Sequence, residues 1–377
     1  MSSTTPSAPS NPSPTPPNYS AFQTELYTSS ILHGKKPLIT TDPNKLEEQA
    51  RAALPLRSYN YVAGGAGERA TMDANRQAFR RWALVPRMLR DTSAKKVGVE
   101  LFGVKYGEFV GGVNFSFMIR APVLPPPSSF LKKPSTNLSR ASTSGFSVLV
   151  VTLDTWSLAW RPADLDEGYI PFFEGVGNAV GFSDPVFRAG FIAATDGGMP
   201  EDNVGLASAG WVREVCPGRS RTWEDLKMLR GWWGGKIVLK GIQHVEDARL
   251  AVEAGMDGIV VSNHGGRQVD GAIGSLEVLP EIAAAVGDKI TVLFDSGIRT
   301  GVDVIKALSL GAEAVLVGRP AVYGFAIGGA EGAKQVLRGL LADFEMSLGL
   351  AGINGVEGCK PEILRRVEGG GSLRSSN

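Results

Sequence analysis

The 377-residue sequence is poor in the residues that build disulfide frameworks and metal centres. It contains two cysteines, Cys216 and Cys359, and three histidines. Two cysteines are too few for a disulfide scaffold or a cysteine-rich zinc site, so we expect no metal. Three histidines leave few candidates for imidazole chemistry.

The sequence also lacks a charge excess and a long apolar run. Its 39 Lys and Arg residues nearly balance 38 Asp and Glu residues, and a nucleic-acid partner is therefore not expected. No apolar run approaches the roughly 20 residues of a membrane-spanning helix. The first charged residue is Glu25, so the N-terminus has neither the basic start of a secretory signal nor the arginines of a transit peptide. We expect no membrane partner and a cytoplasmic location, with peroxisomal and mitochondrial locations left open.

Composition divides the chain into five segments. Residues 1–40 start with a Ser/Pro-rich stretch that cannot bury enough surface to offset its ordering entropy, and we expect a disordered tail. Residues 41–103 have a helical pattern and form the N-terminal part of the main domain. Residues 104–146 are irregular, residues 147–368 are regular, and residues 369–377 are expected to be a flexible tail.

The regular segment alternates short apolar runs with helical patterns, and a long amphipathic helix follows. Near-continuous apolar strands separated by helices indicate a parallel sheet buried on both faces, and hence an α/β fold. The predicted strands are 147–154, 236–240, 258–262, 290–295 and 313–318.

Each of these strands ends in a polar or glycine-rich cluster. Chemistry at the carboxyl ends of successive parallel strands favours a (β/α)8 barrel, because a doubly wound sheet would concentrate its ligand at one switch point. The clusters are Thr152-Leu153-Asp154, Lys240, Ser262-Asn263-His264, Asp295-Ser296-Gly297 and Gly318-Arg319-Pro320.

The last two clusters predict a phosphate site. Asp295, Gly297 and Arg299 follow one strand, and Gly318 and Arg319 follow the next. Each loop combines flexible backbone amides with a guanidinium, at the position where barrels commonly bind phosphate. The alternative is that the glycines only make tight turns, but two such loops in succession favour phosphate.

His264 is the histidine with the strongest chemical context. It follows a predicted strand and shares the strand-end face with Asp154 and Arg267. This set combines a base, an orienting carboxylate and a cation for an anionic substrate. His244 lies at a helix start and is interpreted as a solvated capping residue, while His33 lies near the tail and has no such context.

Lys240 ends a buried strand, which is an unusual position for a flexible cation. It either forms a Schiff base or supplies fixed positive charge to a cofactor or anion. A structural ion pair is the remaining interpretation, although no acidic partner is evident beside it in the sequence.

Several segments together resemble the FMN-dependent α-hydroxy-acid oxidases and dehydrogenases, a family that includes glycolate oxidase, lactate oxidase and flavocytochrome b2. The segments are YNYVAGGAGER, IVLKGI, SNHGGRQVDGAIGSLEVLPEI and DSGIRTGVDVIKALSLGAEAVLVGRP. A further segment, VTLDTWSLAWRPADLDEGYIPFF, is closer to the lactate 2-monooxygenase branch. The resemblance covers about 40–103 and 145–368, and it implies an FMN-linked TIM barrel and a homo-oligomer, typically a tetramer.

The resemblance also implies an activity, the oxidation of a small, lactate-like L-2-hydroxy acid with FMN as cofactor and oxygen as acceptor. It implies that His264 takes a proton while a hydride equivalent passes to the flavin. Asp154 would stabilise the resulting imidazolium, and Lys240 the reduced flavin ring.

Further roles for binding residues follow from the same resemblance. Arg267 would bind the substrate carboxylate, with Tyr61 and Arg161 beside it. Without the resemblance, Tyr61 would be interpreted as an ordinary packed aromatic residue. The implied cofactor contacts are Thr152, Lys240, Ser262, Asp295, Gly297, Arg299, Gly318 and Arg319.

The resemblance breaks between Gly103 and Ser147. The family pattern places three strands there, whereas this interval has at most one, near 115–120, followed by the Pro/Ser-rich stretch 121–145. We therefore expect 104–146 to replace early strands and the barrel to lack about two β/α units. Noncoding sequence read through as protein is the favoured explanation, because the catalytic residues outside this region are present; a degenerate paralogue is the other.

Two further hypotheses compete with a working oxidoreductase. One is a catalytically inactive paralogue or splice product that retains only the phosphate-binding half. The other is a different phosphate-binding barrel such as an isomerase, against which the combination of Lys240 with His264-Gly-Gly-Arg argues.

Overall fold

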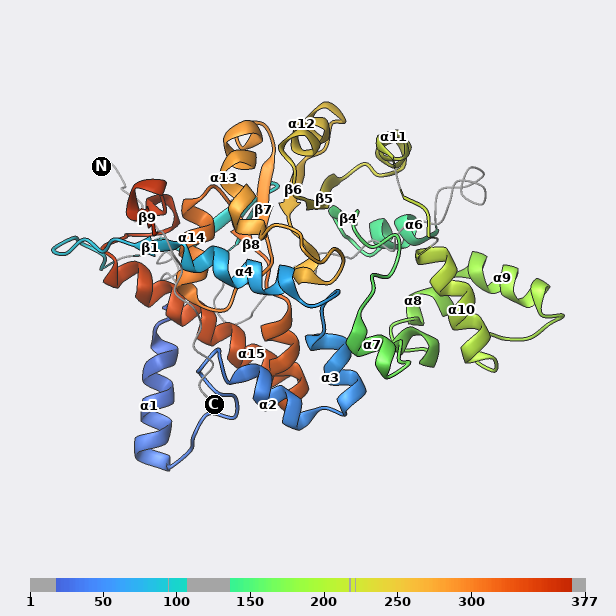
Figure 1. Cartoon of the computed structure of the whole chain (residues 1–377), viewed down its shortest axis with the longest axis horizontal. Helices are drawn as coiled ribbons and strands as arrows, with labels where there is room; N and C mark the ends of the chain where they lie inside the picture. The colour runs from blue at the N-terminus through green and yellow to red at the C-terminus, as the bar shows by residue number, and fades with distance from the viewer. Residues whose placement is uncertain (1–17, 94, 107–135, 217, 221, 368–377) are drawn as a thin grey trace, which may run out of the picture.

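The computed structural model describes residues 18–367 apart from residues 94, 107–135, 217 and 221. Its centre is a parallel sheet in which five strands follow one another in chain order (Figure 1). Each strand coincides with a predicted apolar run, which confirms the α/β class. The strands are β4 (Val148–Thr152), β5 (Lys236–Ile242), β6 (Gly258–Val261), β7 (Thr291–Phe294) and β8 (Ala314–Val315).

Helices connect these strands and cover the sheet. In Figure 1, α11, α12 and α13 lie along its upper side, and α2, α3 and α15 lie below. Helix α15 begins beside the β8 loop and runs to the end of the predicted amphipathic helix, with a break at Gly328-Gly329. The connecting and C-terminal helices are α11 (Trp223–Trp232), α12 (Val245–Glu253), α13 (Ser275–Val286), α14 (Gly301–Ser309) and α15 (Arg319–Leu350).

Both faces of the sheet are buried, as the continuous apolar runs indicated. Alternate residues such as Leu239 and Phe294 pack into the core beneath the connecting helices. The residues between them, including Val238 and Val260, form a second cluster on the other face. Phe102 packs against this second cluster from the antiparallel hairpin of β2 (Val99–Leu101) and β3 (Val104–Tyr106).

The remaining elements surround this sheet. In the N-terminal part they are α1 (Ala21–His33), α2 (Leu46–Ala53), α3 (Leu56–Ala63), α4 (Ala70–Arg80) and β1 (Trp82–Leu84), which pairs with β9 (Leu364–Arg366). After the hairpin come α6 (Thr136–Thr143), α7 (Pro162–Asp166), η1 (Pro171–Glu174), α8 (Ala179–Phe182), α9 (Pro185–Ala194) and α10 (Val204–Val215). Three short 3-10 turns complete the set, at η2 (His264–Gly266), η3 (Val356–Gly358) and η4 (Pro361–Ile363).

The structure differs from the expected disordered tail at residues 21–33, which form α1. Phe22 is buried against α15, with the Arg338 guanidinium 4.1 Å from its ring centre. Arg338 also donates to both carboxylate oxygens of Glu25 at 2.7 Å. These contacts with a distant helix stabilise α1, whose own sequence has little amphipathic pattern. The expected tails at 1–17 and 369–377 lie outside the described residues.

The predicted loss of two β/α units falls on a region that the structure describes only in part. Within the described residues, the segment 104–146 contributes β3 and α6, and residues 107–135 lie outside the description. The described sheet has five strands, with β4 and β8 at its edges. The incomplete barrel therefore stays a prediction.

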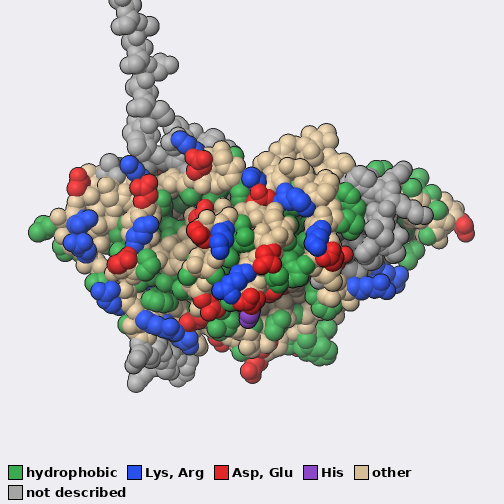
Figure 2. Space-filling view, turned by 90° about the horizontal axis from the view of Figure 1, so that it is seen from above, with side chains coloured by type: hydrophobic (Ala, Val, Ile, Leu, Met, Phe, Trp, Pro, Cys, Tyr) green, Lys and Arg blue, Asp and Glu red, His purple; other side chains and the backbone are tan. Residues whose placement is uncertain are grey.

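The surface shows charges of both signs. Lys and Arg side chains are interspersed with Asp and Glu side chains over the face in Figure 2. In the part of the chain that the structure describes, no helix has both the length and the apolar character needed to cross a membrane. Within the same residues, no group of three or more His, Cys, Asp or Glu side chains is arranged to hold a metal ion.

Candidate active site

The parallel register brings the predicted strand-end residues together. Thr152 at the end of β4 is paired with Lys240 of β5. The Lys240 Nζ donates to the Ser262 Oγ at 3.0 Å and lies 3.2 Å from the Asp295 Oδ2. Asp295 is thus the acidic partner that the sequence did not reveal. This ion pair and the bond to Ser262 hold the Lys240 side chain in place, which supports a fixed positive charge rather than a Schiff base.

His264 and Asp154 form a direct pair at the same edge of the sheet. The His264 Nδ1 lies 2.9 Å from the Asp154 Oδ1, and each side chain is 18% exposed. His264 has a φ of +57°, in the left-handed region that few residues other than glycine adopt. Its amide donates to the Ser262 Oγ, and the next amide, of Gly265, donates to the Ser296 Oγ. Such strained backbone is concentrated at functional sites.

The electrostatics favour an ionised Asp154. Burial acts to raise the pKa of Asp154, but the hydrogen bond from His264 and the charges of His264 and Lys240 outweigh it, so the net pKa is lowered. Asp154 Oδ2 is buried and has no hydrogen-bond partner among the described residues. A Cβ at Gly241, where φ is +110°, would lie 3.2 Å from the Asp154 Cγ, so glycine leaves room for the carboxylate.

The predicted substrate-binding residues also lie together. The Arg267 Nη1 donates to the backbone oxygens of Tyr61 at 2.6 Å and Gly64 at 3.0 Å, and its guanidinium lies 5.1 Å from the Tyr61 ring centre. Arg161 is buried behind this pair, and its Nε donates to the Arg267 backbone oxygen at 2.8 Å. Tyr61 is therefore part of the arginine cluster and not an isolated packed aromatic.

Two residues to which the sequence assigned no role fix the site. Gln268 accepts a hydrogen bond from Arg161, and its Nε2 donates to the backbone oxygens of Asp154 and Ser157. The Ser296 hydroxyl donates to the Asp295 Oδ1 at 2.7 Å. Both lie next to predicted site residues in the sequence, and that adjacency is the signal that could have found them.

Among the candidate phosphate residues, Arg319 is bonded to backbone oxygens. Arg319 donates to the backbone oxygens of Val62, Gly64 and Gly265, and its burial, with the nearby charge of Arg267, lowers its pKa to about 10. These bonds connect the start of α15 to the end of α3 and to η2.

The two glycines of these loops, Gly297 and Gly318, differ in the space around them. Gly297 has a φ of +96°, and a Cβ there would approach Phe79 and Asn75, so its turn requires glycine. A Cβ at Gly318 would meet nothing within 4 Å. Phosphate binding by these loops stays a prediction.

The side chains at the strand ends fit a flavin mononucleotide. Lys240 offers an ammonium, and the buried residues Thr152 and Ser262 offer hydroxyls. Ring oxygen and nitrogen atoms accept hydrogen bonds from such groups, and a nearby cation favours a ring that gains negative charge. The His264–Asp154 pair at the same edge supplies a base beside it.

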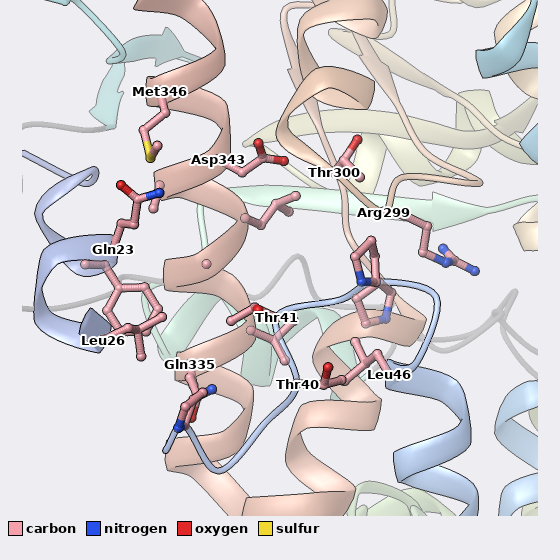
Figure 3. Close-up of a pocket in the computed structure, with 18 of the residues that line it drawn as sticks. Gln23, Leu26, Thr40, Thr41, Leu46, Arg299, Thr300, Gln335, Asp343 and Met346 are labelled. Carbon is pink, nitrogen blue, oxygen red and sulfur yellow. The ribbon is translucent and has the colours of Figure 1, made fainter. Parts of the chain in front are cut away.

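The large cavity in Figure 3 is a separate feature. It has a volume of about 530 Å³ and lies between α1, α15 and the segment that precedes α2. Arg299 lies at the end opposite Gln23 and Leu26, and no other predicted site residue lines the cavity. Arg299 is largely buried, and its pKa is lowered by that burial and by Arg76. Since His264 and Lys240 do not line this cavity, its size alone does not make it the active site.

Comparison with known proteins places these residues in a family. The model of the FMN-dependent dehydrogenase family matches residues 50–108 and 132–366. The unmatched interval between the two ranges falls within the irregular segment 104–146. This discontinuity coincides with the place where the sequence resemblance breaks.

Individual relatives agree with the family match. An FMN-dependent alpha-hydroxy acid dehydrogenase of Penicillium citrinum is 48% identical, over 96% of this chain and 99% of its own length. That alignment runs over 401 positions, more than the 377 residues of this chain, so the relative contains residues without a counterpart here. L-lactate oxidase of Lysinibacillus sphaericus is 34% identical, over 86% of this chain and 92% of its own length.

Solved structures show the same likeness. A mandelate oxidase with (S)-4-hydroxymandelic acid is 31% identical and has a TM-score of 0.66, over 86% of this chain and 98% of that one. The structural neighbours are TIM-barrel flavoenzymes. Together with the strand-end site, these matches show that the chain belongs to the FMN-dependent dehydrogenase family of α-hydroxy-acid dehydrogenases and oxidases, with FMN as its cofactor.

Proposed function

We propose that this chain oxidises a small, lactate-like L-2-hydroxy acid to the 2-oxo acid and passes the electrons to oxygen. The observation that carries the proposal is the His264–Asp154 pair beside Lys240 at the carboxyl ends of β4 to β7. FMN, when bound, accepts the hydride equivalent from the α-carbon. The protein residues bind the acid and remove the hydroxyl proton.

The geometry gives His264 the tautomer that a base needs. When its Nδ1–H donates to the ionised Asp154, the acceptor nitrogen of the ring is Nε2. The hydroxyl proton of the substrate moves to Nε2, and Asp154 stabilises the imidazolium that forms. We assign Arg267 to the substrate carboxylate, because a planar guanidinium matches a carboxylate and this one lies in the cluster with Tyr61.

The names of the relatives include lactate and mandelate oxidases, so the identities of the acid and of the electron acceptor are determined by experiment. Purified protein should be yellow, and anaerobic L-lactate should bleach its flavin absorbance. Air should restore the absorbance with formation of hydrogen peroxide. Failure of every 2-hydroxy acid to reduce a flavin-loaded protein would contradict the proposal. The expected homo-oligomer stays a prediction that mass measurement in solution tests.

Replacement of His264 tests the proposed base, and the same replacement at His244 is the matched control. His264→Gln should retain the flavin and lose its reduction by the acid. His244→Gln should keep both, because His244 only caps α12, where its Nδ1 accepts the Glu246 amide. Equal loss in the two variants would show that His264 is not the base.

The second candidate function is a catalytically inactive chain. The unmatched interval between residues 108 and 132 favours it, because early strands of the family pattern belong there. In this case the protein would bind FMN weakly at most, and no 2-hydroxy acid would reduce the flavin of the FMN-loaded protein. Reduction of the FMN-loaded protein by a 2-hydroxy acid therefore separates the two candidates.

A further inference from the structure

The loop between β7 and α14 carries Arg299, and a buried carboxylate sets the shape of this loop. Asp303, in the first turn of α14, is 4% exposed. Its Oδ2 accepts the backbone amides of Arg299 at 2.9 Å and of Thr300 at 3.2 Å. The Thr300 Oγ accepts the Asp303 amide at 3.1 Å in return. Asp303 therefore fixes the backbone from which the Arg299 side chain extends.

Helix α4, from the N-terminal part of the chain, holds the same loop through Arg76. The Arg76 Nη1 donates to the Asp303 Oδ2 at 2.9 Å and also to the backbone oxygen of Gly297. A Cβ at Gly297 would lie 3.2 Å from the Asn75 Cβ, so α4 and the loop are in direct contact. One guanidinium nitrogen thus connects the start of the loop, and the helix that follows it, to α4.

The Arg299 guanidinium has no comparable support of its own. Its Nη1 donates to the backbone oxygen of Ile298, its neighbour in the chain, at 2.9 Å. In the described part of the chain it forms no ion pair with a carboxylate, since Asp303 pairs with Arg76 instead. Buried charges in proteins are usually paired, so a largely buried guanidinium without a carboxylate suits an anionic ligand. The position of this guanidinium depends on the loop backbone.

We propose that Asp303 and Arg76 are positioning residues for the phosphate of FMN, and that their ion pair holds residues 297–300 in the shape that presents Arg299 to this phosphate. Neither side chain needs to touch the phosphate, because both act through the loop. The inference rests on FMN as the cofactor and on the predicted phosphate role of Arg299, and it holds for any acid that the flavin oxidises. It gives α4 a function in cofactor binding.

The negative charge of Asp303 separates positioning from simple electrostatics. A carboxylate close to a bound phosphate repels it, so electrostatics alone predicts tighter FMN binding when Asp303 is neutralised. Positioning predicts weaker binding, because Asp303→Asn replaces the charge-assisted bond from Arg76 by a weaker neutral one and frees the loop. The two explanations therefore differ in the sign of the effect.

The test measures the affinity of the full-length apoprotein for FMN and for riboflavin, by titration of flavin fluorescence. Riboflavin has the same ring system and lacks the phosphate, so a general loss of structure weakens both flavins and a displaced loop weakens FMN alone. Asp303→Asn and Arg76→Gln should each raise the Kd of FMN at least about tenfold, the effect of one lost hydrogen bond to a charged group. The Kd of riboflavin should change less than about threefold.

Two further variants frame this comparison. Arg81→Gln is the matched control, because it breaks the exposed ion pair of Arg81 with Glu277 at the end of α4 and should change neither Kd. The double variant Arg76→Gln/Asp303→Asn should bind FMN no more than about threefold more weakly than either single variant, because the two residues act through one ion pair. If Asp303→Asn does not fold, Arg76→Gln carries the test, since the Arg76 side chain is 30% exposed.

Three results would overturn the proposal. They are tighter or unchanged FMN binding in Asp303→Asn, equal weakening of FMN and riboflavin, and additive losses in the double variant. Arg299→Gln identifies the cause of a failure, because selective loss of FMN in this variant alone would leave the phosphate role of Arg299 intact and remove only the positioning role. The binding comparison needs no turnover, so a failure of every acid to reduce the flavin would overturn the proposed function and leave this inference standing.

Discussion

Replacement of Asp154 by Asn tests the central pair of the site most directly. The variant keeps the shape of the side chain and removes its negative charge. The His264 Nδ1 lies 2.9 Å from the Asp154 Oδ1. In the proposed mechanism, a charge-assisted hydrogen bond stabilises the imidazolium that forms during proton transfer, and in the variant only a neutral amide would remain.

The size of the effect follows from that bond. A hydrogen bond to a charged group contributes about 1.5–3 kcal/mol, and each 1.36 kcal/mol corresponds to a tenfold change in rate. Asp154→Asn should therefore slow flavin reduction by roughly 10- to 150-fold. The free energy of unfolding should also fall, because the lowered pKa of Asp154 means that its charge is favoured in the fold.

Anaerobic stopped-flow measurement of flavin absorbance at saturating 2-hydroxy acid measures this step. Asp288→Asn is the matched control, because Asp288 is an exposed carboxylate in the turn before β7. It should reduce its flavin at the wild-type rate. A decrease of less than about threefold in Asp154→Asn, with its flavin retained, would refute the role of Asp154 in stabilising the imidazolium.

Three further predictions concern stability. Phe294→Ala, at a fully buried position of β7, should lower the free energy of unfolding by about 3–5 kcal/mol, measured as a lower urea midpoint. Phe22→Ala should release α1 from α15, which faster amide hydrogen exchange across 21–33 would reveal while the sheet stays protected. Burial acts to raise the pKa of Asp257, but bonds from the Ile237 amide, Lys236 and Arg230 lower it overall. The ionised Asp257 therefore stabilises the fold fully above the ordinary pKa of an Asp, about 4. This stabilisation is lost as the pH falls through the lowered pKa of Asp257 in the folded protein. Asp257→Asn should show a weaker loss of melting temperature on acidification.

The sheet could be predicted because its signal is local. Each strand is a short apolar run, and the helical patterns between the last four require parallel strands. The strand-end residues could be predicted for the same reason, since parallel register places the carboxyl ends at one edge. His264 and Asp154 are far apart in the sequence, and their 2.9 Å contact follows from that rule.

Other features depend on partners that the sequence does not identify. Lys240 has no acid beside it in the chain, and Asp295 approaches it only because β5, β6 and β7 are adjacent. Helix α1 has a weak amphipathic pattern, so its stability depends on Arg338, which lies more than 300 residues away. The sequence favoured phosphate as the partner of Arg319, whereas the structure places its guanidinium on the backbone carbonyls of Val62 and Gly64, which are distant in the chain.

The order of the strands decides which of the proposed catalytic residues is most sensitive to the irregular segment. Lys240, His264 and Asp295 are held by β5, β6 and β7, which have neighbours on both sides. Asp154 follows β4, which is an edge strand among the described residues and follows segment 104–146 directly. An edge strand has one row of unpaired backbone groups and less support for its position. A change in segment 104–146 therefore affects the position of Asp154 first. Through the contact of Asp154 with His264 it also affects His264, while the Lys240–Asp295 pair keeps its geometry.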